Sequence, residues 1–279
     1  MGRKENVPRI RVGDIHMYYD IIGEGFPLVL IMGFMGNADC WDPVYFIPRL
    51  SEHFKVITFD NRGAGRTDLS DKEEYTIQMM ADDTAGLMDA LGIEKAHVLG
   101  ISMGGMIAQE LAINHPKKVE KLVLASTFCG GPKAVPIPGE AAQMVTQIME
   151  LLSQKGKWDR EVAFKLLPFI FTEEFMRENP GVMEVASDLI LVAPTPPEGI
   201  VRQVGAILSF DACDRLPQIK APTLILAGRK DKYIPPENAE IMAKRIPNSK
   251  LVYFEHSAHQ LQEEIEKVTD TVLEFLLSS

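Results

Sequence analysis

The chain has 279 residues, of which 46% are hydrophobic and 24% are charged, and this composition excludes a disordered protein. The formal net charge is -10, which argues against a nucleic-acid-binding protein, because such proteins normally carry a basic face. No apolar run is long enough to span a bilayer, so no membrane association is predicted.

The N-terminal sequence MGRKENVPRIRVGD contains no apolar stretch, so it predicts no secretory signal. Cys40, Cys129 and Cys213 lie far apart and are odd in number. Their spacing fits neither a metal site nor a disulfide framework. These features together indicate a protein of the reducing cytoplasm.

Short apolar runs alternate with helical patterns along most of the chain. Residues 9–22 predict a hairpin that turns at Gly13 and Asp14. The runs that follow are rich in Val, Ile and Leu, which is typical of strands buried on both faces of a parallel sheet. These predicted strands are residues 28–32, 55–59, 96–99, 121–125, 223–227 and 250–254.

Helical spacing of apolar residues indicates helices between these strands. One is predicted between Thr76, as its N-cap, and Gly92, and another over residues 103–114. A third begins near Pro236, and a fourth carries apolar residues to the C-terminus. The alternation predicts an α/β protein with an eight-stranded, mostly parallel sheet and helices on both faces.

The alternation breaks between residues 128 and 211, where helical patterns follow one another without a clear strand. We interpret this stretch as a helical cap inserted after the sixth strand. The predicted division is a core of residues 1–128 and 212–279 and a cap of residues 129–211. The helical patterns in the cap cover residues 141–152, 158–171, 181–192 and 198–210.

The motif Gly100-Ile101-Ser102-Met103-Gly104 lies between a predicted strand and a predicted helix. In this context G-x-S-x-G predicts a nucleophile elbow, a strained turn that projects the serine hydroxyl from the edge of the sheet. Both flanking positions need glycine, because a side chain there would collide with neighbouring backbone. We therefore predict Ser102 as a nucleophile.

A serine hydroxyl needs a general base, and the chain has six histidines. Four lie in the hairpin, in polar connections or inside a strand. His256 and His259 follow the last predicted strand, at the edge where a parallel sheet places its active site. We choose His259, at the start of the C-terminal helical segment. The pair lacks further metal ligands, so no metal is predicted.

A carboxylate must orient the imidazole and stabilise its charged form. Asp231 follows the predicted strand 223–227 through Gly228-Arg229-Lys230. Asp211 and Asp214, where the chain leaves the cap, are the alternatives. We choose Asp231, because of its place after a strand and because the chain order is then Ser, Asp, His.

The developing oxyanion needs two preorganised N–H donors. The amide of Met103, directly after the nucleophile, is one. The loop Met32-Gly33-Phe34-Met35-Gly36 follows a predicted strand, and its glycine allows a close approach. We predict the amide of Phe34 as the second donor.

Five segments of the chain match a known pattern: Gly33-Phe34, DNRGAGRTD at 60–68, GISMGG at 100–105, GRKD at 228–231, and His259 followed by Glu264. On these segments the sequence resembles the α/β-hydrolase superfamily, in its esterase and lactonase branch with a helical cap. Residues 75–127 most resemble 3-oxoadipate enol-lactonases. Two positions depart from the family pattern, since Met32 stands where His is usual and Ala258 where Gly is usual. These departures leave the triad intact and leave the substrate open.

The segment 60–68 contains Gly63 and Gly65, but Asp68 stands where a dinucleotide fingerprint needs a third glycine. We therefore interpret Asp60 and Arg62 as structural partners in a loop beside the active site, and predict no cofactor.

These observations predict a serine hydrolase (a carboxylesterase or lactonase) that acts on a small, largely apolar ester or lactone through an acyl-enzyme. Cleavage of a carbon–carbon bond, or cofactor-free perhydrolase chemistry, would use the same triad. A non-catalytic small-molecule receptor on the same fold is the alternative from another class, and a homodimer is left open. The candidate substrate-contacting residues, which core packing explains equally well, are Met35, Met106, Phe128, Trp158, Phe169, Phe171, Met176 and Ile234.

Overall fold

The structure of the protein is a computed structural model and describes residues 8–278. Eight strands of this part of the chain form one sheet in the order β1-β2-β4-β3-β5-β6-β7-β8. The pairs β1–β2 and β2–β4 are antiparallel, and the others are parallel. The predicted α/β fold class is confirmed. The strands are β1 (Arg9–Val12), β2 (Ile15–Ile22), β3 (Phe26–Ile31), β4 (Phe54–Phe59), β5 (Ala96–Ile101), β6 (Val119–Ala125), β7 (Thr223–Gly228) and β8 (Ser249–Phe254).

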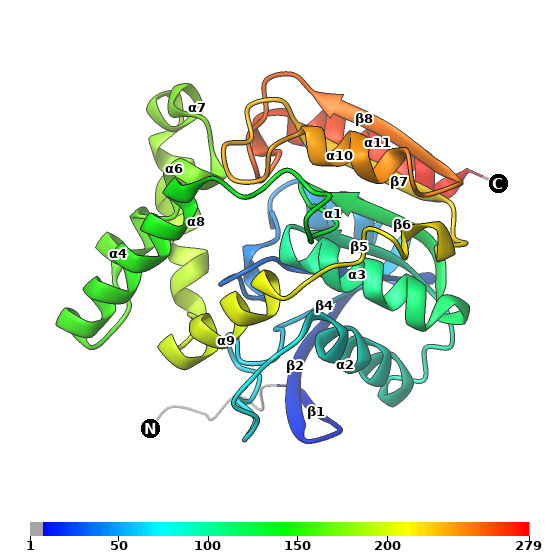
Figure 1. Ribbon diagram of the computed structural model, residues 1–279, viewed down its shortest axis with the longest axis horizontal. Coiled ribbons are helices and arrows are strands. Elements are labelled where there is room, and N and C mark those ends of the chain that lie inside the picture. The colour runs from blue at the N-terminus through cyan, green and yellow to red at the C-terminus, as the bar shows by residue number, and fades with distance from the viewer. Residues whose placement is uncertain (1–7, 279) are drawn as a thin grey trace.

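Successive strand residues point into two hydrophobic cores, one on each face of the sheet. In β3, Val29 and Ile31 belong to one core, and Leu28 and Leu30 belong to the other. Because both faces are covered by helices, the inner strands are nearly continuous Val, Ile and Leu. The first face is covered by α2 (Ile77–Ala90), α3 (Met103–Asn114) and α10 (Glu237–Ala243), and the second by α1 (Phe46–Ser51) and α11 (Ile265–Leu277) (Figure 1).

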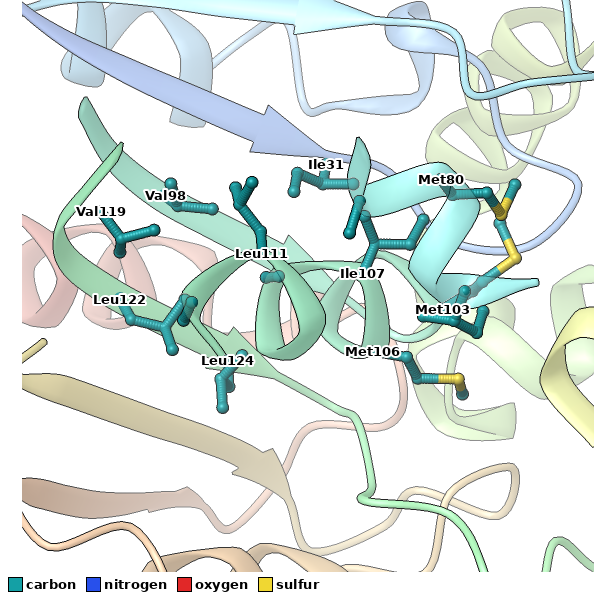
Figure 2. Close-up of a cluster of buried hydrophobic side chains, with 14 of the residues drawn as sticks. Ile31, Met80, Val98, Met103, Met106, Ile107, Leu111, Val119, Leu122 and Leu124 are labelled. Atoms are coloured by element: carbon teal, nitrogen blue, oxygen red, sulfur yellow. The ribbon is translucent and has the colours of Figure 1, made fainter. Parts of the chain in front are cut away.

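Helix α3 is fixed against the sheet along an apolar stripe. Met103, Ile107 and Leu111 recur at helical spacing and are fully buried. Figure 2 shows them in one cluster with Val98 of β5 and Leu122 of β6. This packing holds the N-terminus of α3 at the edge of the sheet, directly after Ser102.

The chain between β6 and β7 forms a helical cap, which confirms the predicted insertion after the sixth strand. The cap has a hydrophobic core of its own, in which Ile148, Val162 and Ile200 are fully buried. In Figure 1 helices α4, α6, α7 and α8 lie beside the sheet, on the left of the view. The cap helices are α4 (Gly139–Lys155), α5 (Arg160–Phe164), α6 (Leu167–Ile170), α7 (Glu173–Glu178), α8 (Pro180–Val192) and α9 (Pro197–Leu208).

The two ends of the cap lie side by side. Cys129 follows β6 and forms a disulfide with Cys213, 84 residues further along the chain. Next to it, Gly130 and Asp211 form an antiparallel bridge. The expectation that no disulfide forms is wrong for this pair, because the stems of the cap bring together cysteines that are distant in sequence. The prediction of a reducing compartment is therefore no longer supported by the absence of a disulfide. We propose that the cap begins and ends at this junction, at residues 129 and 211.

Most predicted elements appear in the structure, with differences that have local causes. The hydroxyl of Thr76 accepts the N–H of Met79 (3.0 Å) as the N-cap of α2, and α3 has its predicted bounds. The helix predicted over 158–171 is split into α5 and α6, since Pro168 lacks the N–H that a continuous helix would need. Helices α1 and α7, of six residues each, are too short to show a period and were not predicted.

Within residues 8–278 no helix combines the length and the apolarity that a bilayer crossing requires. The first seven residues of the segment predicted to lack a secretory signal lie outside the described residues.

The buried side chain of His97 in β5 makes the free energy of unfolding depend on pH. Its ring is 6% exposed and packs against Phe26 and Phe54, with ring centroids 4.8 and 5.6 Å away. Burial lowers the pKa of His97 from 6.5 to about 4. An unfolded chain therefore takes up this proton near pH 6.5 and the folded chain only near pH 4. The free energy of unfolding is expected to fall over that range, by roughly 2–3 kcal/mol from this group.

Urea unfolding of the wild type and of His97→Phe, at pH 7 and at pH 4.5, measures this contribution. The phenylalanine variant cannot take up the proton, so its free energy of unfolding should fall less than that of the wild type. An equal loss in both proteins would show that His97 does not carry the pH dependence.

Candidate active site

Ser102 occupies a sharp turn between β5 and α3. Its backbone has φ 56° and ψ -123°, a region that non-glycine residues adopt only where the surroundings impose it. A Cβ on Gly100 would collide with the carbonyl of Gly104, and one on Gly104 would collide with the backbone at the end of β3. The turn is tied to β6, because the Ser102 N–H donates to Ala125 (3.0 Å) and the hydroxyl of Thr127 donates to the Ser102 carbonyl (2.8 Å).

His259 and Asp231 come from loops after neighbouring strands, β8 and β7. Nδ1 of His259 is 2.8 Å from Oδ2 of Asp231, and both residues are buried. The other carboxylate oxygen, Oδ1, accepts the N–H groups of Tyr233 (2.8 Å) and Ile234 (2.9 Å). Because a carboxylate only accepts hydrogen bonds, the His259 proton belongs on Nδ1, and Nε2 is left as a base.

His259 lies in a turn, and the following 3-10 helix η4 (Gln262–Glu264) begins three residues later. The expectation that His259 starts the helical segment is therefore wrong. This turn lies five residues beyond the end of β8 (Ser249–Phe254). His256, by contrast, is exposed.

Ser102 and His259 line the same cavity, which has a volume of about 520 Å³. The ring of Tyr233 packs against that of His259, with centroids 5.0 Å apart. Burial raises the pKa of Tyr233 to about 12 and that of the Cys40 thiol, also in the wall, to about 12. Both groups are therefore neutral at physiological pH.

The loop after β3 runs past Ser102. A Cβ on Gly33 would stand 3.0 Å from the Cβ of Ser102, so the backbone passes close to the serine. Phe34 follows and lines the cavity. Met103 is the first residue of α3, and its N–H has no carbonyl to bind within its own helix. One predicted oxyanion donor thus directly follows Ser102 in the chain and the other follows Gly33, whose backbone passes close to Ser102, and their catalytic role stays a prediction.

The pattern of the alpha/beta hydrolase fold family matches residues 27–264. The chain belongs to the alpha/beta hydrolase family. An esterase from Thermogutta terrifontis is 30% identical, with 96% of this chain and 98% of that one covered and a TM-score of 0.81. An enol-lactonase from Burkholderia xenovorans is 27% identical, with 97% and 100% covered and a TM-score of 0.83. RutD from Azorhizobium caulinodans, whose assignment as a carbamate hydrolase is provisional, is 30% identical over 91% of both chains.

The cavity of this alpha/beta hydrolase is lined by some of the residues predicted to contact substrate and not by others. Met35, Phe169 and Phe171 are in its wall. The others pack in the core or within the cap. The sequence does not separate the two groups, because large apolar residues near the end of a sheet occur both in the core and in the wall of a cavity. The residues outside the wall are Met106, Phe128, Trp158, Met176 and Ile234.

The cavity wall is mostly apolar; besides Ser102 and His259, its polar side chains are those of Asp42, Tyr45, Tyr233, Gln260, Gln262 and Glu266. Oδ1 of Asp42 accepts the N–H groups at the start of α1, and Oδ2 accepts the side-chain amide of Gln262 (2.8 Å). None of the described residues that line the cavity is Lys or Arg. An anionic substrate group would therefore find no cation to pair with inside it. The cap contributes Met144, Leu166, Phe169, Ile170, Phe171, Gly181, Val182, Val185, Ala186, Leu189 and Ile190.

The two alternative carboxylates lie at the stem of the cap, away from His259. Asp211 is exposed, and its Oδ1 accepts the N–H of Cys213 (3.2 Å). Asp214 forms an ion pair with Lys133. Among residues 8–278 no group of three or more His, Cys, Asp or Glu side chains is placed to hold a metal ion.

The segment 60–68 has a structural role, but Asp60 and Arg62 do not pair with each other. Oδ2 of Asp60 accepts the Arg66 guanidinium (2.8 Å), while Arg62 binds Asp83 (2.6 Å) and Asp14 (2.9 Å). The pKa of the Asp14 carboxyl is lowered by its hydrogen bond to Arg62.

Several polar residues around the site were not found from the sequence. The buried side chain of Asn61 donates to the carbonyl of Met32 (2.8 Å), and the buried Gln203 and Thr195 both bind the backbone of Met35 in the same loop. From the sequence alone, a polar residue that becomes buried on folding cannot be distinguished from a polar residue on the surface. The only signal was that Asn61 lies in a segment matching the family pattern.

Proposed function

We propose that the protein is a serine hydrolase that cleaves carboxylic esters, lactones included, whose acyl part is uncharged and largely apolar. The observation that carries the proposal is His259, hydrogen-bonded to Asp231, in the wall of the same cavity as a serine on a strained elbow. The wall of that cavity is mostly apolar and carries no Lys or Arg among the described residues.

In the proposed reaction His259 accepts a proton and then donates it, first when the acyl-enzyme forms and again when it is hydrolysed. The Oγ of Ser102 attacks the ester carbonyl and gives its proton to Nε2 of His259, and the oxyanion accepts the N–H groups of Phe34 and Met103. His259 then protonates the leaving alkoxide, which departs as the alcohol. Water, deprotonated by the same nitrogen, attacks the acyl-enzyme; the bond to Ser102 breaks, His259 returns the proton to the Ser102 Oγ, and the acid is released. A lactone yields one hydroxy acid.

The charge and size of the cavity distinguish among the activities of related folds. A 3-oxoadipate enol-lactone and a ring-fission dienoate each carry a free carboxylate, which would be buried without a partner. Carbamate is far smaller than a cavity of about 520 Å³. An apolar acyl chain or ring fits both properties, so ester or lactone cleavage is favoured over carbon–carbon bond cleavage.

A pair of esters that differ only in one charge tests the proposed substrate class. The p-nitrophenyl monoester of adipic acid carries a free carboxylate, and its methyl ester has the same acyl length without the charge. We expect kcat/KM to be at least ~100-fold higher for the methyl ester, because desolvating an unpaired carboxylate costs several kcal/mol. Equal or faster cleavage of the anion would overturn the proposed preference, and turnover of a ring-fission dienoate alone would favour carbon–carbon bond cleavage.

Labelling with a fluorophosphonate distinguishes the hydrolase from a receptor on the same fold. The probe phosphonylates only an activated serine, so mass spectrometry should find it on Ser102. A receptor would bind small apolar molecules without labelling and without turnover.

A further inference from the structure

The backbone at Met35, directly after the predicted oxyanion donor Phe34, is held by two side chains of the cap. Met35 is buried and has a left-handed backbone, with φ 60°. Its N–H donates to Oε1 of Gln203 (3.3 Å), and its carbonyl accepts the hydroxyl of Thr195 (3.1 Å). Both polar groups of this peptide segment are therefore satisfied from the cap.

Gln203 and Thr195 are themselves fully buried and fixed. Gln203 lies on α9, and its Nε2 donates to the carbonyl of Arg62 (3.3 Å), so one orientation of the amide satisfies both contacts. The carbonyl of Thr195 accepts the indole N–H of Trp158 (2.8 Å). The contacts to Met35 thus come from buried cap residues that each make a further hydrogen bond.

The same loop is held at two further points. On its N-terminal side, the core residue Asn61 donates to the carbonyl of Met32 (2.8 Å). On its C-terminal side, Nδ2 of Asn37 donates to the carbonyls of Leu189 (3.1 Å) and Ala193 (3.1 Å) at the end of α8. The peptide bond between Gly33 and Phe34 therefore lies between Met32, which is bound by the core, and Met35 and Asn37, which are bound by the cap.

A left-handed conformation costs a non-glycine residue about 1–2 kcal/mol, so Met35 keeps it only while its surroundings impose it. Without the two cap contacts, the loop could relax and turn the Phe34 N–H away from the oxyanion. We propose that Gln203 and Thr195 are positioning residues, through which the cap fixes the oxyanion hole as well as covering the substrate. This inference rests on the proposed function.

The variants Gln203→Met and Thr195→Val remove the hydrogen-bonding atoms at similar side-chain volume. We expect each to lower kcat about 10-fold, with KM changed less than about twofold, because a small displacement of a donor weakens the transition state more than the bound ester. Inhibition by a trifluoromethyl ketone, whose tetrahedral adduct carries an oxyanion, should weaken in parallel with kcat/KM. Thr195→Ser keeps the hydroxyl and should retain wild-type kcat.

Arg202→Met is the matched control, because Arg202 neighbours Gln203 on α9 but donates to the carbonyl of Ser70 (2.8 Å) and not to the oxyanion loop. It should leave kcat and ketone inhibition unchanged. If Arg202→Met lowers kcat as much as Gln203→Met, the effect is general destabilisation of the cap, and the positioning role is overturned.

Hydrogen exchange of the amides at residues 33–36 provides a readout that does not depend on turnover. Exchange there should be faster in Gln203→Met and Thr195→Val than in the wild type and Arg202→Met. Unchanged exchange together with unchanged kcat would overturn the inference. A wild type that neither cleaves esters nor reacts with a fluorophosphonate would overturn the proposed function instead, even where exchange shows that the cap holds the loop.

Discussion

Replacement of Ser102 by alanine is expected to lower kcat for ester hydrolysis by at least ~10⁴-fold. The hydroxyl is the proposed nucleophile, and no other group at the elbow can form the acyl-enzyme. The fold should be unaffected, because both serine and alanine carry a Cβ and are strained to a similar degree by the φ of 56° at this position. Steady-state kinetics, fluorophosphonate labelling and thermal unfolding of the variant together check this result.

Ser126 offers a matched control for this variant. It is also a buried serine with positive φ (45°), at the end of the neighbouring strand β6, and its hydroxyl has no hydrogen-bond partner among the described residues. Ser126→Ala should leave kcat within about twofold of the wild type, since this hydroxyl does not line the cavity. If Ser126→Ala abolished activity and Ser102→Ala did not, the nucleophile would be misassigned.

Asp231→Asn is expected to lower kcat by about 10³–10⁴-fold. The asparagine oxygen can still accept the N–H groups of Tyr233 and Ile234, which now bind Oδ1 of Asp231. The asparagine NH₂ then faces Nδ1 of His259 and favours the tautomer with its proton on Nε2. That nitrogen can no longer take the proton of Ser102, so the general base is lost while the packing is kept.

The carboxylate at Asp211 is the control for this substitution, because it was one of the two alternative candidates and lies exposed at the stem of the cap. Asp211→Asn should leave kcat unchanged. A large loss of kcat in Asp211→Asn, with little effect of Asp231→Asn, would reverse the assignment of the acid.

The fold was largely predictable because its strands and helices carry local patterns. The helix after Ser102 has an apolar stripe and a Pro116 beyond its end, and its predicted bounds are those observed. Helices α1 and α7 are too short for a periodic signal. The bond between Cys129 and Cys213 joins residues 84 apart, and three cysteines alone do not say which pair the topology brings together.

The sequence indicated a candidate site where the proposed chemistry demands one residue type in one context. Ser102 between two glycines, after a strand and before a helix, meets that condition. Substrate-contacting residues do not, since Phe128 in the core and Phe169 in the cavity wall are both large apolar residues near the same sheet edge. Gln203 was missed because its function depends on a buried contact with Met35 across 168 residues.

The paired stems of the cap, at Gly130 and Asp211, mean that the chain leaves the core and returns to it at almost the same point. An insertion whose two ends lie together can change in length or sequence while the spacing of β6 and β7 stays the same. The three groups of the proposed triad all belong to loops of the sheet. The architecture therefore keeps the proposed catalytic groups on the sheet and the cap in a separate insertion, linked through the hydrogen bonds between the cap and the loop after β3.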